Sequence, residues 1–271
     1  MNCPRCNANV AFSKKRCDNC GQDLKNYRRV VGLSNIYYNK GLSQAKVRDL
    51  SGAISSLKLS LQFNKLNTNA RNLLGLVYLE EGEIVSALSE WVISKHYQSE
   101  NNDAEDYIKM IQSNPNKLET YNQTIRKYNS ALNSAKHGDE DMAIIQLKKV
   151  VNLNPKFIRA HQLLALLYMM TGKKDNRVKA LKLLRNISQI DVTNTTTLRY
   201  MKELSDVHIR GESPKVQPKV VKKEPERRTL PQVDPDAYKT ITPYKEERPS
   251  IMPFINIVVG IVIGLALMYF L

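Results

Sequence analysis

Aromatic residues, cysteines and recognisable catalytic motifs are all scarce in this sequence. Aromatic residues make up 7% of the chain, and alternating β-branched runs are few, a composition typical of an all-α protein. The four cysteines all lie near the N-terminus, so none remains elsewhere as a nucleophile. The four histidines are scattered, and the sequence contains neither a phosphate-binding Gly-rich loop with lysine nor a His-Glu-x-x-His motif. We therefore predict that the protein is not an enzyme.

Negative charge is also scarce relative to positive charge. Lys and Arg number 41 against 26 Asp and Glu, which gives 271 residues a net charge of +15. An excess of this size favours contact with anionic surfaces, whether lipid headgroups or nucleic acid, and charge alone does not choose between them. The length is sufficient for one repeat domain with small attachments.

The first 25 residues contain two pairs of cysteines with two residues between the members of each pair. This spacing lets both thiolates of a pair reach one metal ion, and Asn7 and Gly21 follow the pairs as residues that tolerate the left-handed backbone. The pattern resembles a very short zinc ribbon over residues 1–25, which implies structural Zn²⁺ in a closed Cys₄ site. Iron in a rubredoxin-like site and disulfides are the less favoured alternatives. The predicted ligands are Cys3, Cys6, Cys17 and Cys20.

Basic residues lie between the cysteine pairs and after them. A basic ribbon can touch nucleic acid, whereas the alternative is that metal binding only folds a segment too small to fold alone. Single-strand stacking would require aromatic residues interleaved with the basic ones, and there are none here. We therefore favour the structural interpretation. The basic residues are Lys14, Lys15, Arg16, Lys25, Arg28 and Arg29.

The stretch Tyr128–Pro155 predicts two short amphipathic helices joined by a tight turn. Ala131 on the first helix and Ala143 on the second are small enough to let the helices approach closely, while larger apolar residues fill the seam. A single hairpin of this kind cannot bury its apolar face, so the chain is expected to contain further copies.

The same setting recurs three more times. Ala53, Ala87 and Ala180 correspond to Ala143, and the first two are 34 residues apart (87 − 53). The order of small, aromatic, glycine, small and large apolar residues at this period resembles the tetratricopeptide repeat (TPR), a helix–turn–helix unit that stacks into a superhelix. The resemblance covers roughly residues 34–192, and it implies an all-α, TPR-type helical-hairpin solenoid that serves as a binding scaffold.

One insertion interrupts this period. Ala87 and Ala143 are 56 residues apart (143 − 87), which is 22 more than one repeat. We predict an additional helix over Asp103–Gln112, broken at Asn114-Pro115, and then a longer helix, so that the extra structure lies near residues 103–127. The surplus is interpreted as a lengthened structural element rather than a dedicated partner site.

The end of the array differs from the other units in two ways. Ala143 and Ala180 are 37 residues apart (180 − 143), and the surplus of 3 is assigned to a turn over Gly172–Arg177. A last helix from Thr195 to about residue 209 is expected to cap the array, because terminal units need a polar-backed cover. The repeat domain is therefore predicted to span residues 34–210.

The first helices of the four units are expected to line a concave groove that binds a partner protein or peptide. Apolar positions amid Asn and Gln suit a peptide or helix lying in such a groove. For any one leucine, packing against the neighbouring helix is the alternative interpretation. The predicted groove residues are Asn35, Tyr38 and Leu42 in the first unit, Asn72, Leu76 and Leu79 in the second, Tyr128, Leu132 and Lys136 in the third, and Gln162, Leu166 and Met169 in the fourth.

The C-terminal part of the sequence changes character after the repeats. Residues 211–250 are rich in Pro, Lys and Glu, and are predicted to form a disordered linker. Within residues 251–271, the uncharged run Phe254–Leu271 has 18 residues, or about 27 Å as a helix, close to the ~30 Å thickness of a bilayer core. We predict that residues 251–271 form a transmembrane helix that anchors the chain in a lipid bilayer.

The flanking charges predict a topology for this span. The basic N-terminal portion and the absence of a cleavable signal peptide favour a single-pass protein with its N-terminal domain in the cytoplasm. Gly260 and Gly264 form a GxxxG pair that would allow a homodimer through the membrane helix. The layout is similar to that of bacterial membrane-anchored TPR proteins with an N-terminal zinc ribbon, which implies the bacterial cell membrane. The chain is either tail-anchored or part of a protein that continues beyond Leu271.

Three hypotheses about function follow. The favoured one is a membrane-tethered scaffold or adaptor whose groove binds a partner protein or peptide at the cytoplasmic face. The second is binding of nucleic acid or anionic lipid through the basic ribbon and repeat surface. The third is a regulator in which the ribbon senses metal or redox state and passes it to the repeats.

Overall fold

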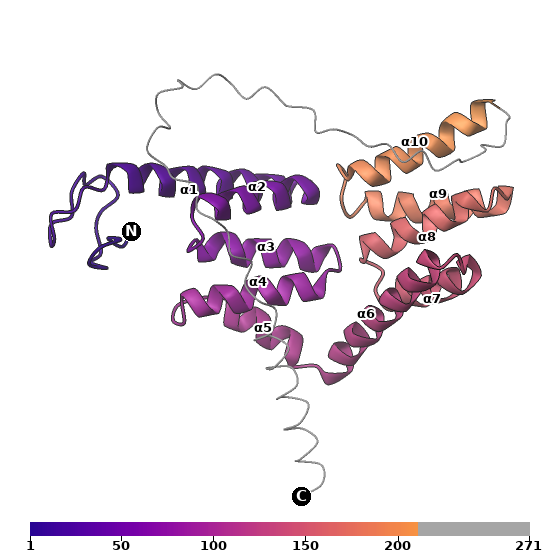
Figure 1. Ribbon diagram of the computed structural model, residues 1–271, viewed down its shortest axis with the longest axis horizontal. Helices are drawn as coiled ribbons and strands as arrows, with labels where there is room; N and C mark the ends of the chain where they lie inside the picture. The colour runs from indigo at the N-terminus through magenta and orange to yellow at the C-terminus, as the bar shows by residue number, and fades with distance from the viewer. Residues whose placement is uncertain (211–271) are drawn as a thin grey trace, which may run out of the picture. The chain divides into compact units, whose positions relative to one another are not determined.

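The computed structural model describes residues 1–210. The predicted linker at 211–250 and the predicted membrane helix at 251–271, with Gly260 and Gly264, lie outside the described residues. Within the described part, no helix combines the length and the apolar character that crossing a membrane requires. The helices are α1 (Lys25–Lys46), α2 (Leu50–Phe63), α3 (Thr68–Glu80), α4 (Ile84–Tyr97), α5 (Ala104–Gln112), α6 (Pro115–Lys136), α7 (Glu140–Leu153), α8 (Ile158–Met170), α9 (Lys174–Ser188) and α10 (Thr195–Arg210) (Figure 1).

Eight of these helices pair into hairpins, namely α1–α2, α3–α4, α6–α7 and α8–α9, while α5 lies between the second and third hairpins and α10 follows the fourth. The small residues that defined the repeat lie at the centres of the hairpins. On the second helices, Ala53, Ala87, Ala143 and Ala180 are all 0% exposed. On the first helices, Gly41, Gly75, Ala131 and Ala165 are buried opposite them. The all-α helical-hairpin repeat predicted from the sequence is therefore confirmed.

Glycine at the hairpin seam is required where a large side chain crosses it. A Cβ atom at Gly75 would lie 2.2 Å from Nε1 of Trp91, so only glycine leaves room for the indole ring. Trp91 is completely buried, and its Nε1 donates a hydrogen bond to the backbone oxygen of Asn72 at 3.1 Å. A Cβ atom at Gly41 would likewise lie 2.7 Å from Cγ of Leu57. The close helix approach expected from the sequence thus has a direct steric cause.

Helix α9 differs from the sequence prediction. The surplus of three residues was assigned to a turn over Gly172–Arg177, but α9 already begins at Lys174. The surplus therefore lengthens the helix at its start instead of enlarging the turn. Three residues are close to one helical turn of 3.6 residues, so the addition leaves Ala180 facing α8 and keeps it buried.

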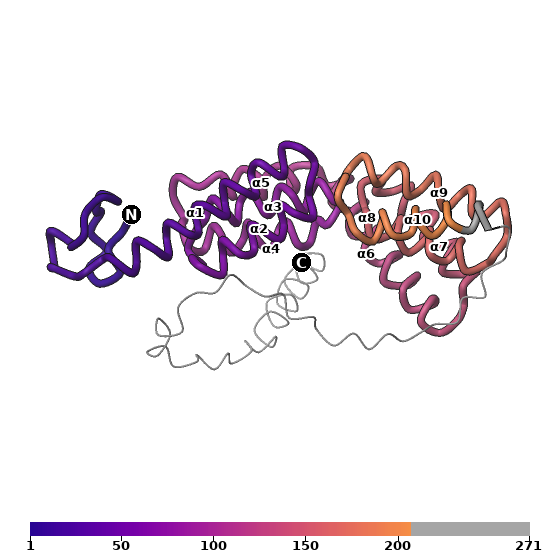
Figure 2. Tube along the Cα trace, turned by 90° about the horizontal axis from the view of Figure 1, so that it is seen from above, coloured from indigo at the N-terminus to yellow at the C-terminus, as the bar shows by residue number. Residues whose placement is uncertain are grey.

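The buried apolar side chains of the hairpins form two cores. One contains Trp91 and draws on α2 to α5, with side chains of α1 and α6 packed against it, and the other contains Leu164 and draws on α6 to α9. Helix α6 contributes to both cores, because Tyr121 and Ile125 pack against the first and Tyr128 against the second. We call α1–α5 the first stack and α6–α10 the second stack (Figures 1 and 2).

The two stacks meet at hydrogen-bonded loops, which we call the joint. The turn between α3 and α4 contacts the loop between α7 and α8. The side-chain amide of Asn154 donates to the backbone oxygen of Gly82 at 3.0 Å, and the backbone N–H of Ile158 donates to the backbone oxygen of Glu81 at 3.3 Å. Gly82 has φ of +76°, and a Cβ atom there would lie 2.7 Å from the backbone of Phe157. Hairpin turns of the first stack thus dock on loops between helices of the second.

The second half of the joint connects the first hairpin to the last. The carboxylate of Asp191, which is 1% exposed, accepts hydrogen bonds from the backbone N–H groups of Leu50 and Ser51 at 3.1 and 3.2 Å. Both N–H groups belong to the first turn of α2, where they have no partner within the helix. The backbone N–H of Val192 also donates to the oxygen of Arg48 at 3.0 Å. Asp191 therefore caps a helix that lies 140 residues earlier in the chain.

Candidate metal centre and repeat surface

The four cysteines converge on one point at the N-terminal end of the described chain. Their Sγ atoms all lie within 4.8 Å of one another. Sγ of Cys3 is 3.6 Å from that of Cys20, and Sγ of Cys6 is 3.6 Å from that of Cys17. Four sulfurs each ~2.3 Å from a central zinc ion would lie about 3.8 Å apart in a tetrahedron. The donor set and its spacing therefore fit a tetrahedral Cys₄ metal site.

Each cysteine pair is presented by the same backbone turn. The N–H of Asn7 donates to the oxygen of Cys3 at 3.0 Å, and the N–H of Gly21 donates to that of Cys17 at 2.9 Å. Asn7 and Gly21 have φ of 57° and 70°, so both adopt the left-handed conformation that the sequence predicted for them. Two copies of one local structure thus bring four thiols together.

The thiols do not share one electrostatic environment. The backbone N–H of Ala8, followed by the side chain of Asn19, lowers the pKa of Cys6 to about 6. At Cys20 the backbone N–H of Gln22 acts in the lowering direction, but burial and the neighbouring Cys6 sulfur together raise its pKa to about 12. Without a cation, Cys6 would therefore be largely ionised at neutral pH while Cys20 would keep its proton, and a bound divalent ion would displace that proton.

The cysteine-rich segment continues directly into the repeats. Residues 26–33, which lie between the predicted ribbon at 1–25 and the predicted repeat domain at 34–210, form the first turns of α1. The guanidinium of Arg28 on α1 lies 5.4 Å from the ring centroid of Phe12, a residue of the segment between the cysteine pairs. The segment's own core is small and consists of Cys3, Val10, Cys17 and Leu24.

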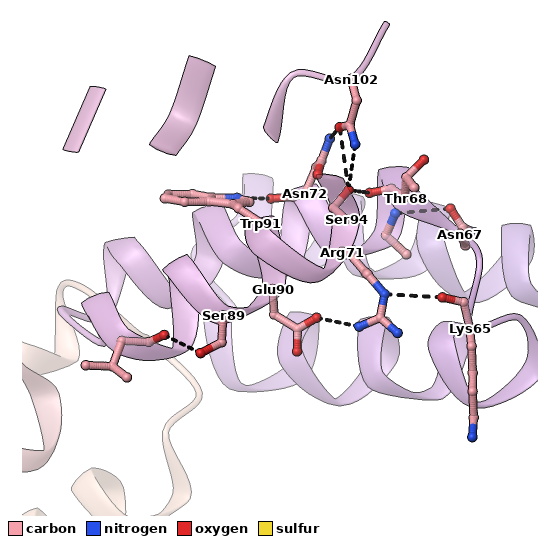
Figure 3. Close-up of polar contacts among 12 residues, drawn as sticks. Lys65, Asn67, Thr68, Arg71, Asn72, Ser89, Glu90, Trp91, Ser94 and Asn102 are labelled. Carbon is pink, nitrogen blue, oxygen red and sulfur yellow. Dashed lines mark hydrogen bonds and ion pairs between the residues drawn. The ribbon is translucent and has the colours of Figure 1, made fainter. Parts of the chain in front are cut away.

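The predicted groove residues of the first stack include both structural and exposed side chains. Asn72 is buried, and its amide donates to Oδ1 of Asn102 at 2.7 Å, within a network that also includes Ser94 and Trp91 (Figure 3). Tyr38, Leu76 and Leu79 are half-buried and pack against the first core. Asn35 is exposed and Leu42 is half-buried outside that core.

The groove residues predicted on α6 and α8 belong to the second stack. Gln162 donates to Oδ1 of Asn194 at 2.7 Å and to Oγ1 of Thr197 at 3.0 Å, so its amide fixes the start of α10. The rings of Tyr128 and Phe157 lie 4.8 Å apart. Met169 packs against the second core, Leu132 and Leu166 are half-buried outside it, and Lys136 is exposed. The structure therefore distributes the twelve predicted residues over two stacks.

One feature repeats on the first helix of every hairpin. Leu42, Leu76, Leu132 and Leu166 each directly follow the buried small residue of that helix, and each is half-buried. Because they occupy the same register, they lie on equivalent faces of the four first helices. Side chains at this register can pack inward with one part of their surface and contact a ligand with the rest.

The joint contains acidic residues that the sequence analysis did not single out. A cavity of about 290 Å³ lies there, lined among others by Ser51, Glu81, Glu83 and Arg159. Nε of Arg159 lies 2.9 Å from Oε1 of Glu83. Burial, followed by the charges of Asp191 and Glu83, raises the pKa of Glu81 to about 7. No local pattern marks these residues, because their partners lie on distant parts of the chain.

The raised pKa of Glu81 predicts that stability falls as pH rises. The folded pKa is about 7 against an ordinary value of 4.5, so the folded state holds the proton more tightly between these values. Ionised Glu81 therefore lowers the free energy of unfolding. This loss is absent below pH 4.5, the ordinary pKa, and complete above the folded pKa of about 7. As pH rises from 5 to 8, the wild type should lose on the order of 2 kcal/mol of unfolding free energy that Glu81→Gln keeps, after allowance for the partial exposure of Glu81.

Urea titration at both pH values measures this difference. The exposed Glu203 on α10 provides the control, because Glu203→Gln should follow the pH dependence of the wild type. If Glu81→Gln also follows the wild type, Glu81 does not titrate in the joint as described.

Comparison with known proteins gives matches only among solved structures. No family model and no curated protein matches the chain. The chain is similar to the TPR domain of P58(IPK), at a TM-score of 0.36 and 16% identity, over 65% of this chain and 46% of that one. It is also similar to YrrB, a TPR protein with an unusual peptide-binding site, at a TM-score of 0.27 and 20% identity, over 61% and 90% of the two chains.

A third similar structure is PilF of Pseudomonas aeruginosa, at a TM-score of 0.28 and 14% identity, over 67% of this chain and 72% of that one. The neighbours P58(IPK) and YrrB are TPR proteins. The chain spans less than half of the P58(IPK) structure it matches.

Proposed function

We propose that this protein is a membrane-tethered scaffold whose first-helix faces bind a partner protein or peptide. The observation that carries the proposal is the leucine that recurs at one register of all four first helices, half-buried in each. A repeated apolar side chain of this kind suits a peptide or an amphipathic helix whose own apolar residues recur. Asn35 and Lys136 are exposed on the same helices and add polar groups.

The cysteine cluster is proposed to hold structural Zn²⁺. Cys3, Cys6, Cys17 and Cys20 would supply all four ligands, which leaves no open position for a substrate or a reactive water. The metal would contribute the folding free energy that a core of so few residues lacks. The support for this assignment is the close approach of the four sulfurs in two equivalent turns.

The tether is proposed from the sequence. The uncharged run Phe254–Leu271 supports insertion into a bilayer, and the basic residues before it support a cytoplasmic location for the repeats. Fractionation of cells that express the full chain tests this part of the proposal. Recovery of the full chain in the fraction without membranes would contradict it.

Substitution of the recurring leucines tests partner binding. We expect Leu42→Lys/Leu166→Lys in the full chain to lose a partner that the wild type captures, at least ten-fold, because each lysine brings a charge to an apolar contact. The matched control is Val85→Lys/Val178→Lys, which places the same charges on second helices at residues that are 54% and 69% exposed. Equal capture by both double variants, measured by quantitative mass spectrometry after cross-linking, would contradict the proposal.

A further inference from the structure

A second surface, separate from the first-helix faces, lies between the second helices of the last two hairpins. A groove of about 300 Å³ separates α7 from α9, and its floor is formed by α8. Leu164 and Tyr168 of the floor are 1% and 5% exposed. Val151 from α7 and Leu183 from α9 are half-buried and line the sides. The groove is therefore apolar at its base.

The rim of this groove is basic. Lys148 on α7 and Lys179 and Lys182 on α9 line it, and all three side chains are exposed. Nζ of Lys179 lies 5.9 Å from the ring centroid of Tyr168, so this cation already lies over the aromatic floor. Within the part of the chain that the structure describes, none of the three lysines forms an ion pair with a carboxylate.

The surrounding helices do not neutralise this charge. Helix α9 carries five basic residues and a single acidic one, Asp175, which lies in its first turn. The two acidic residues of α7, Glu140 and Asp141, also lie in its first turn, whereas Lys148 is two turns further on. Three ammonium groups thus surround one apolar groove without a counter-charge. A ligand that supplies carboxylates would relieve their mutual repulsion.

Two polar side chains of the groove further restrict which ligand can bind. Asn152, near the C-terminal end of α7, and Asn186, near the C-terminal end of α9, both line it. Each amide offers both donors and an acceptor, which matches the alternation of N–H and C=O groups along a peptide backbone. A phosphodiester group presents acceptors only and has no apolar group to fill the floor, and a membrane surface is too flat to enter a groove between helices.

We propose that this groove binds an acidic peptide segment of a partner protein, with one large apolar side chain inserted toward Leu164 and Tyr168. Aspartate or glutamate residues on either side of that anchor would pair with Lys148, Lys179 and Lys182. The site opens between second helices and only its floor belongs to α8, so it can be occupied together with the first-helix faces. It does not depend on the function proposed for those faces.

The test uses the full chain in detergent and the peptide Glu-Glu-Leu-Phe-Glu-Glu-amide, labelled with fluorescein on its N-terminal amine. We expect saturable binding by fluorescence anisotropy, and at least ten-fold weaker binding to Lys148→Glu/Lys182→Glu. The matched control is Lys15→Glu/Lys65→Glu, which changes the net charge equally at exposed lysines outside the second stack. Its affinity should stay within about two-fold of the wild type, because exposed charges beyond a Debye length of ~8 Å are screened.

Two further arms separate the proposal from its alternatives. A peptide with Ser-Ser in place of Leu-Phe should bind at least ten-fold more weakly, because it leaves the floor empty. Leu42→Lys/Leu166→Lys should bind the Leu-Phe peptide like the wild type, which distinguishes this site from the first-helix faces. The proposal is overturned if the Leu-Phe peptide does not bind, if both charge-reversal pairs weaken it equally, or if the Ser-Ser peptide binds equally well. It is also overturned if only an oligonucleotide or anionic vesicles respond to Lys148→Glu/Lys182→Glu.

Discussion

Replacement of Cys17 and Cys20 by serine is expected to unfold residues 1–24 and to leave α2–α10 folded. The segment buries only a handful of side chains, among them Val10 and Leu24, which is too little to offset the entropy of ordering it. Structural zinc contributes roughly 10–16 kcal/mol in small zinc-binding peptides at neutral pH. Loss of two ligands removes most of that contribution, so this is the largest effect that we expect from any substitution in the chain.

Three measurements check this expectation. Native mass spectrometry should show one metal ion per wild-type chain and none in the double variant. Hydrogen exchange should become fast over residues 1–24, while helical circular dichroism changes little because the described helices begin at Lys25. Ser13→Ala is exposed between the cysteine pairs and serves as the control. Retention of one metal ion by the double variant, or slow exchange that persists without metal, would show that the Cys₄ site does not fold the segment.

The same variant separates the scaffold from a metal- or redox-sensing regulator. If partner capture by the repeats persists without the metal, the ribbon does not control the binding faces. If capture is lost while α2–α10 remain folded, the ribbon and the repeats are coupled.

Substitution of Asp191 by alanine is expected to destabilise the described domain by about 3–5 kcal/mol, because several donors lose their acceptor at about 1–3 kcal/mol each. The carboxylate caps the first turn of α2, and its removal leaves the N–H groups of Leu50 and Ser51 without their acceptor. Asp191→Asn keeps one acceptor oxygen and should fall between alanine and the wild type. The control is Asp206→Ala on α10, an exposed residue that should change stability by less than about 0.5 kcal/mol.

Chemical denaturation and hydrogen exchange together test the role of Asp191. The exchange rates of the Leu50 and Ser51 amides should rise in Asp191→Ala by more than the global loss of stability explains, because the joint opens locally. The amide of Asn154, which lies in the other half of the joint, reports whether the opening spreads. A loss of stability below about 1 kcal/mol, with unchanged exchange at both amides, would show that Asp191 does not hold the two stacks together.

The local parts of the fold could be predicted because each is specified over a short distance. Asn7 and Gly21 indicated left-handed turns after the cysteine pairs, and both adopt them. The alanines at the hairpin centres indicated close helix approach, and they are fully buried. At α9 a local prediction was wrong, since a surplus of three residues fits equally well into a longer turn or one more turn of helix.

Residues close together in the sequence specify the predicted sites only in part. The cysteine spacing was sufficient to bring four thiols together, because each pair is presented by its own turn. The surroundings of the groove residues could not be predicted in this way. Repeat register indicates which helix face a side chain lies on, but not which residues contact it there. Asn72 and Gln162 form hydrogen bonds to other parts of the chain, and no spacing within a repeat indicates those partners.

The sequence by itself determined the helices, the hairpins and the thiol cluster, because apolar periodicity, small residues and turn residues act within about 40 residues of one another. Only the tertiary structure decided that the array folds as two stacks joined at loops. That joint depends on Asp191 reaching the first turn of α2 and on Gly82 lying against the backbone of Phe157. Such contacts form only after helices already built have packed, so the residues that make them carry no local pattern.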